Sequence, residues 1–285
     1  MLIVQPVGGL CNRLRAIDAA IALATELQLG LAVLWFPAPD LNASFHDLFE
    51  QPTGIRIIDI RTHVGSRALN RAIRAFFRPT FKCCYLGQPD IEPMLGSRQL
   101  AHRLIECRHA YLQTYSEFWP VQETSAIFRP LPDLLARIER YGRDELVGVH
   151  IRRTDNVASI QHSPIEDFEA AMREEIERDP GTRFFVATDD PAIEAHLRLG
   201  FPGRIVVHEK SSLERSDPRA IRDAVVDLYA LSNCRKLIGS YWSSFTDFAS
   251  RAINRYWPPW APGFLAEQPP GPDAARWPGR RQTFS

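Results

Sequence analysis

The chain has 285 residues, of which 45% are hydrophobic and 24% are charged, enough for cores in two domains of about 140 residues each. Lysine plus arginine and aspartate plus glutamate both number 34, so the net charge is zero, which argues against a nucleic-acid partner held by bulk positive charge. The five cysteines form no Cys-x-x-Cys pair. They predict buried thiols in a reducing, cytoplasmic setting rather than a disulfide framework or a zinc site.

The N-terminal residues predict a β-α-β unit. Its expected elements are a strand at 2–7, a helix at 12–29 that ends at Gly30, and a strand at 31–36. Gly8-Gly9 follows the first strand and does not fit the G-x-G-x-x-G dinucleotide fingerprint. The pair forms either a tight turn only or a loop whose backbone approaches a ligand, in which case Asn12 and Arg13 could also donate hydrogen bonds.

Neither a signal peptide nor a membrane span is expected. No basic segment precedes the first strand, and polar residues interrupt the apolar stretch 16–36. Arginines at helical spacing over 66–78 predict a basic helix face, which is either simply solvated or an acceptor-binding or peripheral membrane surface. Further strands are expected over 55–60 and 104–115, and the proline-containing segment 128–132 is expected to link two domains.

The second half alternates strands with helices more regularly. The expected strands are 146–151, 183–187, 204–207 and 236–238, and the expected helices are 134–141, 164–178, 191–199, 218–231 and 245–255. This alternation predicts an α/β fold with parallel sheets. We expect one domain over 1–130, a second over 131–257, and an irregular tail rich in proline and tryptophan over 258–285.

Polar side chains follow three of the expected strands in the second half. They are Arg152-Arg153, Asp189-Asp190 and Ser243-Ser244. The carboxyl ends of parallel strands share one edge of a sheet, and ligands bind there in open α/β folds. Arginine presents a planar fork that matches phosphate oxygens, so the pair either grips an anionic ligand or forms a solvated surface pair in which Arg153 meets Asp155.

Three motifs in the second half resemble those of the α1,6-fucosyltransferases, which include bacterial nodulation enzymes and animal core fucosyltransferases. His150-Ile-Arg-Arg-Thr-Asp155, followed by Pro164-Ile-Glu-Asp-Phe168, is similar to their first motif. Ala187-Thr-Asp-Asp190 is similar to the second, and Asp227-Leu-Tyr-Ala-Leu-Ser232 with Ser243-Ser244 to the third. The loop Gly8-Gly-Leu-Cys-Asn12 resembles one shared more widely with α1,2- and protein O-fucosyltransferases.

The resemblance implies a GT-B-like fold, two Rossmann-type domains facing a cleft, and an inverting, metal-independent transfer of L-fucose from GDP-fucose to a glycan hydroxyl. The residues implied by position are His150 and Asp227 at guanine, Arg152 at the β-phosphate, Ser243 and Ser244 at the diphosphate, Asp155 and Asp190 supporting the arginines, and the Gly9, Asn12 and Arg13 loop near the phosphate or sugar. The sequence contains no Asp-x-Asp, so no metal cofactor is expected and arginine must supply the positive charge.

Two positions depart from the family pattern. The family has a lysine after the motif aspartate and, four residues further on, a glutamate proposed as general base; here those positions hold Asn156 and Ile160. The proton of the acceptor hydroxyl then goes to His162, to Asp155, or to the departing diphosphate. His162 is otherwise only an exposed loop residue. Two other functions stay open: a transferase for another GDP-sugar, and a non-catalytic module that binds a nucleotide sugar or glycan.

Overall fold

The computed structural model describes residues 1–60, 84–107, 109–121, 128–141, 145–154, 157–214 and 216–252, together with Ala75 and 283–284. The chain forms two compact units. The first comprises Met1–Leu131 and Glu214–Arg222, and the second comprises Pro132–Leu213 and Asp223–Ser285. The basic segment expected at 66–78 lies outside the described residues except for Ala75, as does the tail except for 283–284.

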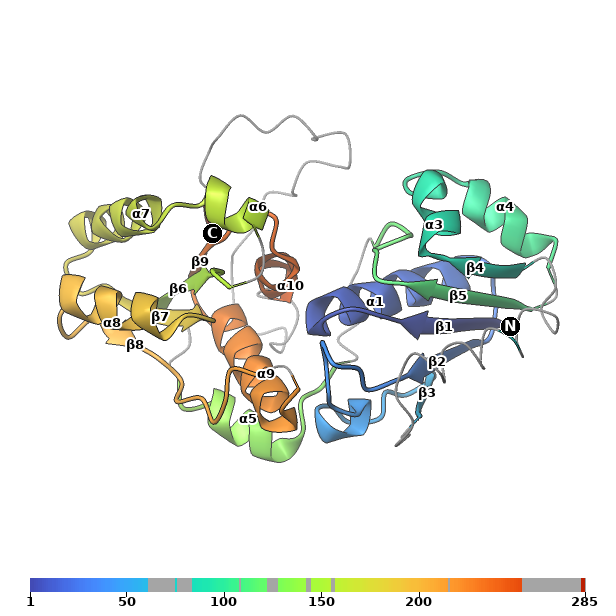
Figure 1. Ribbon diagram of the computed structural model, residues 1–285, viewed down its shortest axis with the longest axis horizontal. Coiled ribbons are helices and arrows are strands. Elements are labelled where there is room, and N and C mark those ends of the chain that lie inside the picture. Colours follow the sequence, from blue (N-terminus) through green and yellow to red (C-terminus); the bar gives the residue numbers. More distant parts are fainter. Residues whose placement is uncertain are drawn as a thin grey trace. The chain divides into compact units, whose positions relative to one another are not determined.

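The first unit contains a five-stranded parallel sheet in the order β3-β2-β1-β5-β4 (Figure 1). Its strands are β1 (Leu2–Pro6), β2 (Leu31–Trp35), β3 (Arg56–Asp59), β4 (Tyr85–Gly87) and β5 (Ala110–Thr114). Its helices are α1 (Leu10–Glu26), α3 (Gln88–Ile91), α4 (Gln99–Ile105) and the 3-10 turns η1 (Phe45–Asp47) and η3 (Glu92–Met94). Parallel strands joined by helices make this a Rossmann-type unit.

The helix α1 ends earlier than its expected stop at Gly30. Gln28 takes a left-handed backbone with φ of 52°, and its N–H donates to the Thr25 carbonyl oxygen. The N–H of Leu29 donates to the Ala24 carbonyl oxygen at 2.8 Å. These two bonds form a Schellman cap, which satisfies the last carbonyls of the helix. Gly30 therefore lies beyond the cap, between the helix and β2.

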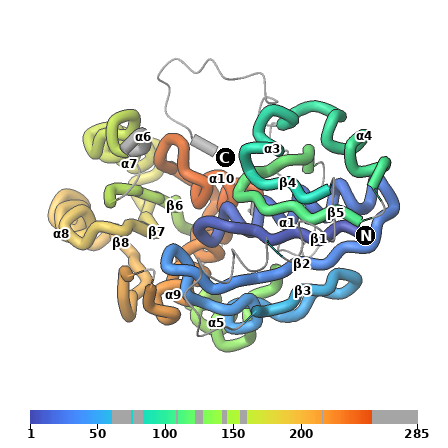
Figure 2. The backbone as a smooth tube through the Cα atoms, turned by 45° about the vertical axis from the view of Figure 1, so that its right-hand side comes forward, coloured from blue at the N-terminus to red at the C-terminus, as the bar shows by residue number. Residues whose placement is uncertain are grey.

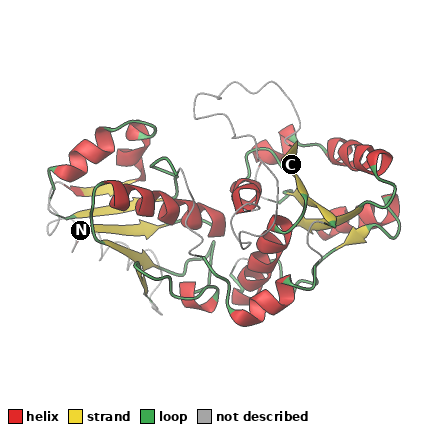
Figure 3. Ribbon diagram, turned by 180° about the vertical axis from the view of Figure 1, so that it is seen from behind, coloured by secondary structure: helices red, strands yellow, loops and turns green. Residues whose placement is uncertain are grey.

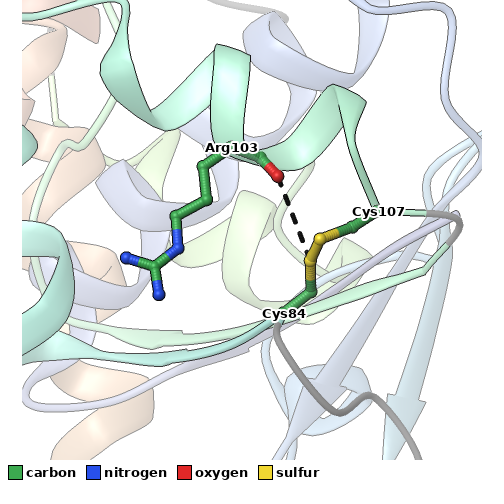
Figure 4. The surroundings of a disulfide bond; sticks show 3 residues. All are labelled: Cys84, Arg103 and Cys107. Atoms are coloured by element: carbon green, nitrogen blue, oxygen red, sulfur yellow. Dashed lines mark hydrogen bonds between the residues drawn. A yellow bond between two sulfur atoms is a disulfide. The ribbon is translucent and has the colours of Figure 1, made fainter.

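A disulfide joins Cys84 to Cys107 in the first unit, which corrects the expectation of unpaired thiols (Figure 4). Cys84 lies just before β4 and Cys107 just after α4, with 6.2 Å between their Cα atoms. The sulfur of Cys84 lies 4.0 Å from the Arg103 carbonyl oxygen. Cys11 and Cys234 are free and buried. Cysteine spacing along the chain could not reveal this pair, because only the fold brings β4 and α4 together.

The second unit contains a sheet in the order β10-β9-β6-β7-β8, in which β6 to β9 are parallel and β10 is antiparallel. Its strands are β6 (Leu146–Ile151), β7 (Arg183–Thr188), β8 (Ile205–Val206), β9 (Lys236–Gly239) and β10 (Thr283–Phe284). Its helices are α5 (Pro132–Ile138), α6 (Val157–His162), α7 (Ile165–Arg178), α8 (Pro191–Gly200), α9 (Pro218–Ser232) and α10 (Ser244–Ala252), shown in red in Figure 3. Five residues of α9, 218–222, belong to the first unit.

Two glycines let helices approach the second sheet closely. A Cβ atom on Gly148, in the middle of β6, would lie 3.1 Å from Leu231 of α9. A Cβ atom on Gly239, at the end of β9, would lie 2.0 Å from Cγ2 of Thr246 in α10, a distance that no side chain tolerates. Helix α10 therefore rests directly on the carboxyl end of β9. The sheet positions the loop before α10 through this contact.

The parallel α/β architecture confirms the fold class expected from the sequence, and β6 has the bounds expected for it. One prediction in this half was wrong: residues 157–162 form the short helix α6 rather than a polar loop. The chain can be followed in order in Figure 2. Among the described residues, no helix combines the length and apolar character needed to cross a bilayer.

Candidate functional site

The polar residues predicted to follow the strands of the second half lie at one edge of the second sheet. The strands β6, β7 and β9 are parallel neighbours, with Ile151 opposite Thr188 and His150 opposite Gly239. The residues that follow these strands therefore meet at a shared carboxyl edge. This edge is where open α/β sheets bind their ligands.

Arg152 is the first residue beyond β6, and two contacts fix it. Its backbone N–H donates to Oγ of the fully buried Ser240 at 2.9 Å. Its Nε lies 3.3 Å from Oδ2 of Asp189, so the half-buried guanidinium of Arg152 forms an ion pair with this carboxylate. The backbone is thus anchored to β9 and the side chain to the end of β7. A guanidinium held in this way is pre-oriented for an anion at the edge of the sheet.

Among the described residues, the carboxylate in direct contact with the arginines is Asp189, whereas the family resemblance implied Asp155, which lies outside the described residues, and Asp190. Asp189 accepts from the backbone N–H of Arg153 at 2.7 Å and from the hydroxyl of Thr154 at 2.7 Å, in addition to its ion pair with Arg152. Asp190 caps α8 instead, by accepting from the N–H of Ala192 at 2.8 Å. The two neighbouring carboxylates therefore have different tasks.

Arg153 turns away from Arg152, toward the start of α7. It donates to the Ser163 carbonyl oxygen at 2.7 Å, and its guanidinium lies 5.9 Å from the ring centre of Phe168. Burial lowers the pKa of Arg153, while Asp189 and Glu166 oppose this shift. The predicted alternative, a surface pair with Asp155, cannot be described because Asp155 lies outside the described residues. Arg153 fixes the junction of α6 and α7, and Arg152 is the arginine held at the edge of the sheet.

His150, the second-last residue of β6, is buried. Its Nδ1 lies 2.7 Å from Oγ1 of Thr246, and its ring stacks on Phe245 with 4.8 Å between centroids. Burial, and then the positive charge of Arg152, lower the pKa of His150 to about 3. A ring that stays uncharged at neutral pH can serve as a hydrogen-bonding surface for an uncharged heterocycle. The contact of His150 with guanine stays a prediction.

Asp227, the other residue predicted to contact guanine, lies on α9 and is 4% exposed. Its Oδ1 accepts from Nδ1 of His208 at 3.2 Å, and its Oδ2 pairs with Nζ of Lys210 at 3.2 Å. His208 holds the matching tautomer because Arg137 donates to its Nε2 at 2.6 Å. Sequence reasoning missed His208 and Lys210, since nothing in their spacing relates them to Asp227. Each carboxylate oxygen retains a further lone pair for a donor on a ligand.

Ser243 and Ser244 lie in the turn that leads from β9 into α10, and both are half-buried. Ser244 is the first residue of α10, and Oγ of Ser243 lies 3.5 Å from the N–H of Thr246. The first backbone N–H groups of a helix lack intrahelical partners, and the helix dipole favours negative charge beside them. Serine hydroxyls and these N–H groups could hold phosphate oxygens together.

His162, the residue predicted as a base, is exposed at the end of α6. Its ring lies 5.1 Å from that of Tyr241, whose backbone N–H donates to Oγ of Ser163 at 2.8 Å. The helix α6 thus contacts the turn before α10. This brings His162 to the same loop cluster as Ser243, which the sequence alone could not show.

Gly9, Asn12 and Arg13 form the predicted loop site of the first unit. A Cβ atom on Gly9 would meet nothing within 4 Å, so its backbone faces open space at the N-terminus of α1. The side-chain oxygen of Asn12 accepts from Arg15 at 2.9 Å. Gly8, with φ of +83°, provides the turn that places Gly9 there. The loop retains a partly exposed backbone that a ligand could approach.

Arg13 does not donate to a ligand as expected, because the residue is only 1% exposed. It donates from Nε to the Gly8 carbonyl oxygen at 2.7 Å and from Nη1 to the Phe36 carbonyl oxygen at 2.6 Å. Its guanidinium also lies 4.9 Å from the ring centre of Trp35. Burial lowers the pKa of Arg13 to about 10, with Asp40 opposing the shift. Arg13 therefore holds the glycine loop from within and does not face a ligand.

No group of three or more histidine, cysteine or acidic residues suited to a metal ion gathers within the described part of the chain. No known family model matches the sequence.

Several solved structures share the fold. NodZ α1,6-fucosyltransferase soaked with GDP-fucose is 17% identical, with 88% of this chain and 92% of that chain covered and a TM-score of 0.56. A mutant of Arabidopsis thaliana FUT1 in complex with GDP is 15% identical, with coverages of 88% and 68% and a TM-score of 0.58. POFUT1 in complex with GDP is 12% identical, with coverages of 90% and 95% and a TM-score of 0.51.

These similarities define the class of fold, a GT-B-like α/β protein built from two Rossmann-type units. The resemblance to the α1,6-fucosyltransferases is confirmed at the level of that fold, since NodZ from Bradyrhizobium matches over 87% of this chain and 91% of its own with a TM-score of 0.54. Identities below 20% carry no activity across to this chain. The facing of the two units across a cleft stays a prediction.

Proposed function

We propose that the protein is an inverting, metal-independent glycosyltransferase that moves L-fucose from GDP-fucose to a hydroxyl group of a glycan. The observation that carries the proposal is Arg152 at the edge of the sheet, whose guanidinium is paired with Asp189 and whose backbone N–H donates to Oγ of Ser240. This arrangement occurs on a fold whose solved examples include proteins crystallised with GDP or GDP-fucose.

In this reaction the acceptor oxygen bonds to the anomeric carbon as the bond from that carbon to the β-phosphate oxygen breaks. Negative charge develops on the departing diphosphate. Arg152 stabilises this charge through its planar fork, and the hydroxyls of Ser243 and Ser244 add hydrogen bonds. The resident arginine supplies the cation in the proposed mechanism, so the proposal includes no metal.

The acceptor hydroxyl must also lose its proton. We assign this proton to a ring nitrogen of His162, because its side chain is exposed beside the turn that carries Ser243. Replacement of His162 by alanine should lower turnover on the order of a hundredfold and remove the acidic limb of the pH–rate profile, with GDP affinity unchanged. A wild-type rate and profile would instead assign the proton to the diphosphate.

The guanine base is assigned to His150 and Asp227. A carboxylate can accept from N1–H and the exocyclic amine of guanine together, which neither uracil nor adenine can match. Calorimetry with GDP, UDP and ADP tests this assignment, and we expect GDP to bind at least tenfold more tightly than the other two. Equal affinities would exclude a guanine site, and unchanged GDP affinity in Asp227→Ala would exclude that residue.

The role of Arg152 is tested by Arg152→Lys, which keeps the charge but loses the fork. We expect a loss of roughly a hundredfold or more in kcat with the fold retained. Stabilisation of developing negative charge by one donor contributes about 3–4 kcal/mol in other enzymes. The measurement is release of GDP together with a fucosylated product. Near-normal turnover would place the phosphate elsewhere.

Two other functions have specific outcomes in the same experiments. A transferase for another GDP-sugar would bind GDP equally well but release it from a different donor in a panel of GDP-sugars. A non-catalytic module would bind the nucleotide sugar and never form a glycosylated product. Asn156 and Ile160, which replace the lysine and glutamate of the family pattern, are the sequence features that keep this second alternative open.

A further inference from the structure

Three aromatic side chains gather beside the candidate diphosphate site of the second unit. They are His162, Tyr241 and Trp242, and we call them the aromatic patch. The rings of His162 and Tyr241 lie 5.1 Å apart, and those of Tyr241 and Trp242 lie 5.9 Å apart at 38°. Two segments contribute: the end of α6 and the turn between β9 and α10.

Trp242 is 74% exposed, although it is the largest type of side chain. Burial of a large aromatic side chain normally contributes a few kcal/mol to stability, and an exposed one gives that up. Single exposed apolar residues are common, but here three neighbouring rings are involved. The exposure of Trp242 therefore calls for an explanation beyond chance.

The backbone of Trp242 adds a second observation. Its φ is +54°, a left-handed value that costs a bulky residue roughly 1–2 kcal/mol. The turn is anchored before and after Trp242. The backbone N–H of Ser240 donates to the His150 carbonyl oxygen at 3.0 Å, and the backbone N–H of Asp247 donates to the Ser243 carbonyl oxygen at 3.0 Å. The turn is thus held in a costly conformation that directs the indole outward. Such conformations concentrate at functional sites.

The position of the patch is the third observation. Trp242 immediately precedes Ser243 and Ser244, so it stands next to the place where the donor sugar would leave the diphosphate. The rings carry polar edges at the indole N–H, the phenol and the imidazole. A pyranose ring fits such a surface, because its C–H face packs on the aromatic face while its hydroxyls reach these polar groups.

We propose that the aromatic patch binds a pyranose unit of the acceptor glycan, with Trp242 as the main stacking surface. This inference rests on the proposed function, since it assumes transfer from a GDP-sugar at Ser243 and Ser244. It assigns part of the acceptor site to the second unit. The ligand class is a neutral oligosaccharide, because the patch consists of aromatic rings and contains neither a carboxylate nor a lysine or arginine side chain.

The test uses Trp242→Gly and Trp242→Phe in the full chain. Glycine removes the ring and adopts a positive φ at no steric cost, so this variant should be as stable as the wild type or more so. Phenylalanine keeps a smaller ring and should restore part of the binding. Leu199→Ala is the matched control, because Leu199 is 84% exposed on α8 and belongs to no part of the site.

The measurement is binding to an array of defined oligosaccharides with GDP present, followed by affinity measurement for the strongest ligand. We expect Trp242→Gly to weaken that affinity at least tenfold, Trp242→Phe by less, and Leu199→Ala not at all. Unchanged affinity in Trp242→Gly, or the absence of any oligosaccharide bound by a wild-type protein that does bind GDP, would overturn the inference. Marked destabilisation of Trp242→Gly would do the same, since it would make the indole a structural residue.

The outcomes also separate this inference from the proposed function. A wild-type protein that binds oligosaccharides through Trp242 but does not bind GDP would support the patch and contradict the transferase. Two other occupants of the patch are tested directly. A dimer that Trp242→Gly converts to a monomer, or Trp242-dependent binding to vesicles of phosphatidylcholine and phosphatidylserine, would overturn the assignment to a glycan.

Discussion

Asp189 connects three neighbours at the end of β7: the guanidinium of Arg152, the N–H of Arg153 and the hydroxyl of Thr154. The change Asp189→Asn keeps the size of the side chain but removes the charge that orients Arg152. We expect it to lower kcat about tenfold to a hundredfold, because the guanidinium loses its fixed direction. Steady-state assays of GDP release measure the effect.

The neighbouring carboxylate provides the control for this experiment. Asn is as good an N-cap as Asp, so Asp190→Asn should leave the free energy of unfolding nearly unchanged. Its turnover should stay within about twofold of the wild type. If the two variants lost activity equally, the supporting role would belong to the pair and not to Asp189. The sequence has two adjacent aspartates after this strand. Only the direction of the backbone after β7 decides which of them contacts the arginines.

The buried imidazole of His150 predicts a dependence of stability on pH. Its folded pKa of about 3 lies below the ordinary value of 6.5, so the unfolded chain binds the extra proton first. The stability that His150 contributes is thus present above pH 6.5 and is lost as the pH falls toward 3. Between pH 7.5 and 5.0 this loss should be about 2 kcal/mol.

Denaturant unfolding at the two pH values measures this loss, with His150→Asn as the comparison. The asparagine variant should be less stable at pH 7.5 but should lose about 2 kcal/mol less than the wild type on acidification. Equal losses in both proteins would mean that His150 does not remain neutral in the folded state. Other titrating groups contribute to both proteins alike and cancel in the difference.

The contact of α10 with β9 is a feature of two elements, and Gly239 controls it. In Gly239→Ala the new methyl group would lie 2.0 Å from Cγ2 of Thr246, so α10 must shift away from the strand. Overpacking of this kind costs roughly 1–3 kcal/mol. The shift should also weaken GDP binding, because it moves Thr246 from His150 and moves Ser243 with the start of the helix.

Gly200 offers the matched substitution. A Cβ atom on Gly200 at the end of α8 would meet nothing within 4 Å, so Gly200→Ala should be neutral or stabilising by up to about 1 kcal/mol. Thermal unfolding and GDP calorimetry on both variants give the comparison. The double change Gly239→Ala with Thr246→Ala should recover part of the lost stability. No recovery would show that the clash is not with Thr246.

Elements with clear periodicity were predictable from the sequence, and short ones were not. The strand β6 and the helix α7 matched their expected ranges to within a residue, because each has a clear hydrophobic pattern. The strand β4 and helix α3 together span only 85–91 and carry no such pattern. The helix α6 was also missed, since its six residues are fixed by contact with the turn before α10.

The site divides in the same way between predictable and unpredictable residues. Arg152 could be found because it immediately follows a buried strand, and His150 because it is a polar residue near the end of that strand. Lys210 and His208 could not, since they act through Asp227, which lies 17 and 19 residues further along the chain. Arg13 was misassigned for a physical reason: a charged residue in a glycine loop suggests a ligand, but this one satisfies buried backbone carbonyls.

At the scale of the whole molecule, the disulfide of the first unit predicts a dependence on redox conditions. Cys84 and Cys107 are 23 residues apart, and closing a loop of this size stabilises a fold by about 3 kcal/mol. Reductant should therefore lower the free energy of unfolding by about this amount, and should have no such effect on a Cys84→Ser, Cys107→Ser variant.

Thiol titration tests the bond itself. Cys84 and Cys107 are paired, and Cys11 and Cys234 are free, so reduction should add two reactive thiols to those that the denatured protein shows without reductant. Five reactive thiols would show that the pair is reduced in the protein as isolated.

The segment Glu214–Arg222 belongs to the first unit although it follows most of the second unit in the chain. The side chain of Asn42 donates to the Ser216 carbonyl oxygen at 2.7 Å, and Arg222 donates to the Asp47 carbonyl oxygen. During synthesis, the ribosome must therefore release more than two hundred residues before the first unit can close. A polypeptide cut after residue 131 would leave the Asn42 side chain and the Asp47 carbonyl oxygen without these partners, so we expect the first unit to be less stable when it is produced alone than when it is part of the full chain.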